Sequence, residues 1–152
     1  MDTGLYFEEY DESWTFETPP VAITDARIQA FVELHGFSTP TYTDPGYMQA
    51  AYGGRLAPGL LVLCTAEGQV LSAGVTRRRG IFLMELTPRF LRPVHAGDTV
   101  AGRIRFQSKK PTSRPDRGVV VTTHEVVNGQ GETVIRYDAT RMIRTRAFVE
   151  PG

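Results

Sequence analysis

Residues 56–74 read LAPGLLVLCTAEGQVLSAG, and this stretch decides the fold. Pro58 is suited to the first turn of a helix, and Gly74 is suited to end one. Apolar residues fill the interval with few polar residues between them, so the expected helix is apolar around most of its circumference. A helix of that kind has to be buried against the rest of the chain.

Downstream of the basic run Arg77–Arg79, the sequence changes to the two-residue period of β-strands. Strands are expected over residues 81–91, 99–108, 118–127 and 133–145, with turn signals at His95–Asp98 and Asn128–Gly131. Residues 109–117 form a longer basic loop between the second and third of these strands. The second half of the chain therefore predicts about four antiparallel strands.

Upstream of the apolar stretch, two shorter helices are expected after a short edge strand at Trp14–Phe16. The first covers residues 24–35, with Thr24 as its N-cap and Gly36 at its end. An irregular polar connection is expected over residues 37–43. Asp44 then caps a second short helix that runs to Gly53.

This order of elements predicts one α+β domain over residues 1–152. A twisted antiparallel sheet that wraps one apolar helix gives that helix the cover it needs. A chain of 152 residues is long enough to bury a core of this kind without disulfides or metals.

The composition excludes several function classes. Seventeen basic and 17 acidic residues give no net charge, so nothing attracts the whole chain to nucleic acid or to a membrane surface. The longest apolar run, Leu60–Cys64, is far shorter than the ~20 residues of a membrane span. The single cysteine, Cys64, and an acidic N-terminus without a signal-peptide pattern favour the cytoplasm. His95 and His124 lack neighbouring metal ligands, so we expect neither a metal nor a cofactor.

Five segments in order carry a family resemblance: residues 36–44, 53–59, 90–98, 114–120 and 128–134. Together they resemble the MaoC-like dehydratases, also called the (R)-specific enoyl-CoA hydratase type. The resemblance implies the hot-dog fold, which is a curved antiparallel sheet around one central buried helix. It also implies a homodimer or a higher homo-oligomer, because hot-dog domains associate through their sheet edges.

The resemblance implies a hydro-lyase that acts on an acyl-CoA or acyl-carrier thioester. Water is added to or removed from the 2,3-bond, which requires a proton-transfer group, a group that orients water and a donor that polarises the thioester carbonyl. Gly59 matches the glycine whose backbone N–H supplies that donor at the start of the buried helix. A helix N-terminus favours the negative charge that develops there.

The catalytic Asp and His of the family are absent from the matching positions. Phe37 stands at the Asp position, Tyr42 at the His position, and Pro58 replaces the His before the glycine. Tyr42 has an ordinary pKa of about 10, so it is a poor base but can donate a hydrogen bond. His35 is the nearest histidine and the reserve base, although a helix-end His that interacts with the helix dipole is the alternative.

The remaining residues of the matched segments are expected to contact substrate. These are Phe37, Thr39, Pro40, Arg55, Pro58 and Leu60. The basic clusters at residues 77–79 and 109–117 either bind the phosphates of a CoA or phosphopantetheine arm or form solvated surface charge.

Two other functions stay open at this point. The missing Asp and His favour a non-catalytic thioester-binding or partner subunit. A hot-dog thioesterase or a biosynthetic enzyme with other acid–base groups is also open, with Glu33 and Glu67 as candidates. Glu67 lies in the apolar helix, where burial can raise its pKa, and an exposed or paired residue at a dimer seam is the alternative.

Overall fold

The computed structural model of the chain describes residues 4–150. Its seven-stranded sheet has the order β1-β5-β6-β7-β3, with β2 also paired to β5 and β4 to β7. All of these pairings are antiparallel. The strands are β1 (Thr15–Glu17), β2 (Val21–Ala22), β3 (Gly80–Leu86), β4 (Arg89–Phe90), β5 (Thr99–Pro111), β6 (Arg117–Asn128) and β7 (Thr133–Arg144).

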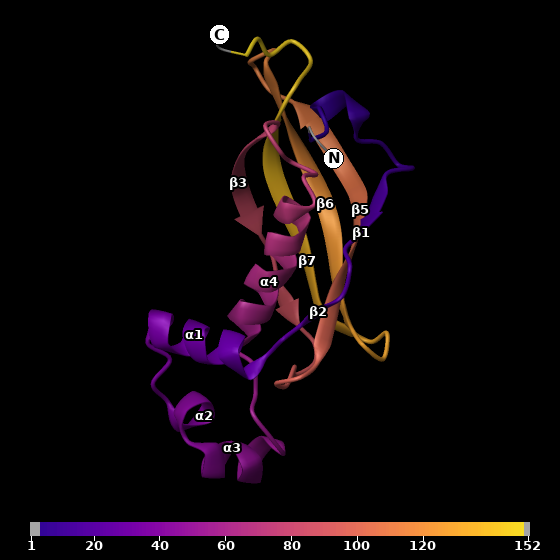
Figure 1. Cartoon of the computed structure of the whole chain (residues 1–152). Coiled ribbons are helices and arrows are strands. Elements are labelled where there is room, and N and C mark those ends of the chain that lie inside the picture. Colours follow the sequence, from indigo (N-terminus) through magenta and orange to yellow (C-terminus); the bar gives the residue numbers. More distant parts are fainter. Residues whose placement is uncertain (1–3, 151–152) are drawn as a thin grey trace.

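One long helix covers a face of this sheet, and three shorter helices lie together beyond one end of it (Figure 1). The long helix is α4 (Gly59–Ser72). The shorter ones are α1 (Asp25–His35), α2 (Pro40–Thr43) and α3 (Pro45–Tyr52), and a 3₁₀ turn, η1 (Phe7–Glu9), precedes β1. The architecture is the α+β arrangement that the order of elements predicts.

The local helix signals are confirmed at both ends of α1 and α3. The Thr24 hydroxyl accepts a hydrogen bond from Arg27 N at 3.2 Å, and the Asp44 carboxylate accepts one from Tyr47 N at 3.0 Å. Gly36 and Gly53 end these helices in the left-handed conformation that glycine adopts without a steric penalty.

Three of the expected boundaries were wrong. The segment over residues 37–43 is not wholly irregular, because Pro40 takes the first position of α2. The loop at 109–117 is shorter than expected, since β5 continues to Pro111 and its last residues pair with β6 as far as Gly118. The expected strand over 81–91 is divided into β3 and β4, which both pair with β7.

The core lies between α4 and the inner face of the sheet. Leu61, Val62, Leu63, Ala66 and Val70 of α4 are buried. The first four pack with inward residues of β5, β6 and β7, among them Val100, Val126, Val134 and Ile135, whereas Val70 packs with Val75 and Ile104. The opposite face of α4 is open, however, because Leu60 is 50% exposed and Leu71 is 55% exposed. The prediction of a buried helix is therefore correct for one face only.

Candidate active site

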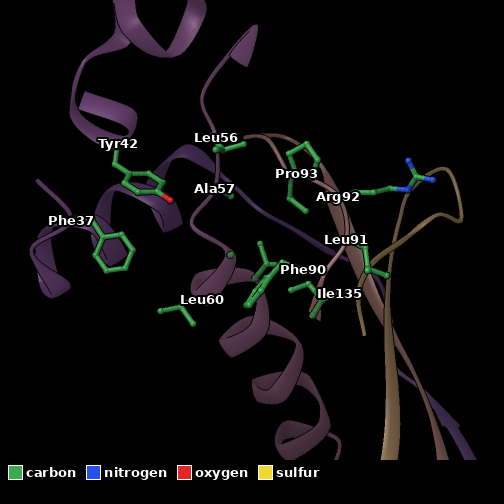
Figure 2. A pocket seen from close by; sticks show the side chains of 13 residues that line it. Phe37, Tyr42, Leu56, Ala57, Leu60, Phe90, Leu91, Arg92, Pro93 and Ile135 are labelled. Carbon is green, nitrogen blue, oxygen red and sulfur yellow. The ribbon is translucent and has the colours of Figure 1, made fainter. Parts of the chain in front are cut away.

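An apolar cavity of about 560 Å³ opens at the first turn of α4 (Figure 2). Its walls come from α4, from the α1–α2 segment, from the residues that precede α4, and from β4 and the loop after it. The lining residues are Phe37, Tyr42, Leu56, Ala57, Gly59, Leu60, Val62, Phe90, Leu91, Arg92, Pro93, Val94 and Ile135.

Gly59 is the first residue of α4 and lines this cavity. Its N-cap residue, Pro58, makes no side-chain hydrogen bond to the first turn. The first N–H groups of a helix have no partner within the helix, so those of α4 are available to an acceptor in the cavity. The positive end of the helix dipole adds to the attraction for a developing oxyanion.

A second reason for glycine at position 59 comes from packing. A β-carbon there would lie 2.8 Å from Phe90 Cδ1 and 2.9 Å from Phe90 Cε1. The ring of Phe90 therefore closes on the helix start, and a larger residue would have to displace it. Close packing and access for a ligand both require the glycine.

Helix α2 places Tyr42 on the wall of the cavity. Its ring lies 5.4 Å from the ring of Phe37, and its hydroxyl points toward the space in front of α4 (Figure 2). Within the described part of the chain, Tyr42 and Arg92 are the only lining residues with ionisable side chains. Arg92 is more than half exposed, and its guanidinium lies 3.6 Å from the Glu132 carboxylate.

The other residues expected at the site divide into two groups. Leu60 lines the cavity, and Pro58 is buried directly before Gly59. His35, Thr39 and Pro40 are exposed and do not line it. The His35 ring packs on Phe31 at 4.4 Å, and Phe31 packs on Phe37 at 5.3 Å, so two aromatic rings separate His35 from Tyr42. Arg55 faces a different cavity.

Several lining residues were not singled out from the sequence. Phe90, Leu91 and Pro93 belong to a segment that was noted only for its resemblance, and Ile135 lies in a strand chosen for its alternation. The pairing of Phe90 with Ile135 across β4 and β7 brings these residues together. The apolar strand-turn before His95 was the available signal, but its contact with Gly59 depends on the tertiary fold.

The comparisons decide the family. The family model described as FAS1-like, dehydratase domain region, matches residues 12–137. The chain belongs to this family. The match spans every element from β1 to β6 together with the first part of β7, and it includes all residues of the cavity. The expected resemblance to dehydratases is thereby confirmed. No curated protein matches the chain.

Solved structures agree on the fold of this family member. A monoamine oxidase regulatory protein from Archaeoglobus fulgidus is 29% identical, with a TM-score of 0.81, 94% of this chain covered and 96% of that one. A MaoC-like dehydratase from Rhodospirillum rubrum is 22% identical, with a TM-score of 0.85 and coverage of 95% and 100%.

A Mycobacterium tuberculosis protein that has a double hot-dog fold identifies the fold of this chain. It is 23% identical with a TM-score of 0.80, and the match covers 98% of this chain but 47% of that one. The chain has the hot-dog fold, and it corresponds to about half of that double protein.

A polar cluster lies on the sheet side of α4. The Glu67 carboxylate accepts a hydrogen bond from Tyr137 Oη at 2.6 Å and forms an ion pair with Arg141. His124 stacks on Tyr137 at 4.4 Å, and its Nε2 lies 2.8 Å from Thr122 Oγ1. Each of these side chains is at least largely buried, and each has a polar partner.

The pKa expected for Glu67 was wrong in direction. Burial alone would raise it, but the charge of Arg141 and the hydrogen bonds from Tyr137 and Arg141 lower the pKa of Glu67 below its ordinary value. Burial lowers the pKa of His124 to about 4. Both carboxylate oxygens of Glu67 are engaged and the residue does not line the cavity, so the geometry does not present it as a free base.

Several basic side chains of the 109–117 segment make contacts within the chain. Lys109 Nζ donates to the carbonyls of Phe7, Glu8 and Tyr10. Arg114 and Arg117 both pair with Asp116, and the hydrogen bond from Arg117 is the main cause that lowers the pKa of Asp116 to about 2. These contacts favour a structural use of the 109–117 segment over phosphate binding. In residues 4–150, no helix is long and apolar enough to cross a membrane.

Proposed function

We propose that the chain hydrates the 2,3-bond of an enoyl thioester, or dehydrates the corresponding hydroxyacyl thioester, at the start of α4. One observation carries the proposal: a helix-start glycine and a tyrosine hydroxyl face the same apolar cavity. Membership of the dehydratase family supports the reaction class.

The backbone N–H of Gly59 is the proposed donor to the thioester carbonyl. As water adds at C3, negative charge moves onto the carbonyl oxygen, and a donor fixed at a helix N-terminus stabilises that charge. The apolar walls make the surroundings of the carbonyl less polar and strengthen this interaction. Phe37, Leu60 and Phe90 are the proposed contacts for the acyl chain.

Tyr42 is the proposed group that holds the reacting water. Its hydroxyl can donate to one oxygen and accept from another, which fixes a water molecule in front of the double bond. His35 is the reserve proton-transfer group of the proposal, and it lies outside the cavity with the rings of Phe31 and Phe37 between it and Tyr42. To act, its ring has to turn from the exposed end of α1 toward the cavity.

A specific observation favours a second candidate, a subunit that binds acyl thioesters without turnover. Among the residues described, no carboxylate or imidazole lines the cavity. Such a protein would use the same donor at Gly59 but would lack the means to move a proton.

Incubation with crotonyl-CoA tests the two candidates. We expect loss of the enoyl absorbance and formation of 3-hydroxybutyryl-CoA. Binding of crotonyl-CoA without turnover would contradict hydration of this substrate and favour the binding subunit. An acyl-carrier thioester of the same acid, assayed in parallel, distinguishes the two kinds of thioester.

The proposed assembly is a homodimer in the cytoplasm. Strand β3 lies at the edge of the sheet, and Phe82, Leu83 and Met84 on it are each exposed by more than 40%. An exposed apolar edge strand needs a cover. The double hot-dog relative supports a second hot-dog unit as that cover. Sedimentation equilibrium is expected to give twice the chain mass.

A further inference from the structure

A second cavity of about 430 Å³ lies among α1, α2, α3 and the turn before α4. Its floor contains the buried side chains of Val32 and Met48. The other lining residues are Gln29, Tyr42, Thr43, Pro45, Gln49, Gly54 and Arg55. Tyr42 lines both cavities, so the second cavity adjoins the proposed thioester site across this one side chain.

Arg55 gives this second cavity a positive wall. Its Nη2 donates to Gln29 Oε1 at 2.6 Å, and its Nη1 pairs with Asp25 at 3.1 Å. Its Nε is buried and has no hydrogen-bond partner in the described structure. Asp25 is mostly solvent-exposed and does not line the cavity, so its ion pair with Arg55 is weak and a carboxylate inside the cavity can compete for the guanidinium.

The cavity therefore presents one guanidinium among neutral polar side chains that can donate or accept hydrogen bonds. Within the described ranges, no carboxylate is part of its lining. Its occupant has to supply acceptors, and a negative charge is favoured over a neutral group. The buried floor suits methylene groups of the same molecule.

We propose that this cavity binds the far end of an acyl chain that carries a terminal carboxylate, so that the substrate is the thioester of a dicarboxylic acid. This inference rests on the proposed thioester site at Gly59. Arg55 precedes Gly59 by four residues, a span of at most about 14 Å of extended chain, which a short or medium acyl chain can bridge. The diphosphate of CoA fits less well, because it carries more negative charge than one arginine offsets.

Binding of unreactive analogues tests the inference without relying on turnover. Saturated acyl-CoA esters of increasing chain length are prepared in pairs that end in a methyl group or a carboxylate. We expect the wild-type protein to bind the carboxylate form about tenfold more tightly at one chain length, because one charge-assisted contact contributes at least that much. Isothermal titration gives both dissociation constants.

Three variants test whether Arg55 causes the preference for the carboxylate form. Arg55→Gln is expected to remove the preference. Gln49→Glu is expected to reverse it, because the new carboxylate repels the carboxylate of the analogue. Gln49 is an exposed residue of the cavity wall, so its substitution spares the core. Arg27→Gln removes a charge from α1 outside this cavity and is expected to keep the preference.

The outcomes separate this inference from the proposed function. Equal binding of both forms at every length, or a preference that survives Arg55→Gln and Gln49→Glu, overturns the dicarboxylic substrate and leaves hydration intact. A preference in binding without turnover of any enoyl-CoA supports the second cavity and counts against hydration. Failure of both forms to bind overturns both.

Discussion

The ring of Phe90 closes on the α-carbon of Gly59, so that a β-carbon at position 59 would lie only 2.8 Å from Phe90 Cδ1. This contact joins the edge of the sheet to the start of the central helix. It also gives a packing reason for glycine at position 59, since Phe90 of β4 fills the space that a side chain there would take. This reason adds to the proposed role of Gly59 in binding a thioester. The same contact therefore places an apolar wall of the cavity beside the first residue of α4.

Substitution of Gly59 by alanine is expected to lower kcat/KM for crotonyl-CoA by about tenfold or more, because the added methyl group displaces Phe90 and narrows the approach to the N–H. The double variant with Phe90→Ala creates room for the methyl group. If it regains activity, the loss was steric. Full activity of Gly59→Ala alone would contradict a close approach of the thioester to this residue.

Removal of the Tyr42 hydroxyl tests the proposed water site. Tyr42→Phe keeps the ring packed on Phe37, so the melting temperature should not change. We expect kcat to fall by about tenfold or more and KM to change little, since the hydroxyl acts mainly on the reacting water. Tyr47→Phe, on the exposed face of α3, is the matched control. An unchanged kcat in Tyr42→Phe would exclude the hydroxyl from the mechanism.

The ion pair between Glu67 and Arg141 is expected to matter for stability. Glu67→Gln leaves Arg141 buried without its carboxylate and should lower the free energy of unfolding by about 3 kcal/mol. The apolar pair Glu67→Leu with Arg141→Met should recover much of that loss. Urea denaturation measures all three proteins, and a loss below about 1 kcal/mol in Glu67→Gln would contradict a buried, mutually dependent pair.

Because His124 is buried, we expect the free energy of unfolding to decrease in acid. Its pKa falls from 6.5 to about 4 on folding because the ring is buried, so the unfolded chain binds the proton more readily between these values. The free energy of unfolding should therefore decrease as the pH drops from 6.5 to 4, by up to about 3 kcal/mol. Glu67, whose pKa is also lowered, adds to the decrease below about 4.5.

The variant His124→Phe keeps an aromatic ring beside Tyr137 but cannot titrate. Its stability should depend less on pH between 6.5 and 4 than that of the wild type, as measured by thermal unfolding at several pH values. Parallel curves for the two proteins would show that His124 does not cause the dependence.

Local signals predicted much of the fold because they act within a few residues. Thr24 and Asp44 cap their helices through neighbouring backbone groups, and Gly36 ends α1 in a conformation that favours glycine. The extension of β5 to Pro111 depends on its pairing with β6, which no short stretch of sequence reveals. The open face of α4 carries Leu60, Cys64 and Leu71, so the apolar pattern alone did not distinguish it from the buried face.

The sequence predicted the residues of the candidate site at the start of α4 better than it predicted the residues around them. Gly59 and Tyr42 followed from the matched segments, and they do line one cavity. Arg55 lies in the same matched segment as Gly59 but faces a second cavity, because its guanidinium is held by Asp25 and Gln29 of α1. The lowered pKa of Glu67 depends on Arg141, which is 74 residues away in the chain.

The central claim is that the start of α4 holds the carbonyl of an acyl thioester. Isotope-edited infrared spectroscopy of crotonyl-CoA labelled at the carbonyl carbon measures this directly. We expect the carbonyl stretching frequency to be lower in the complex than for the free thioester in water, because the N–H of Gly59 and the helix dipole polarise the bond. A bound thioester with the same frequency as in water would contradict the claim.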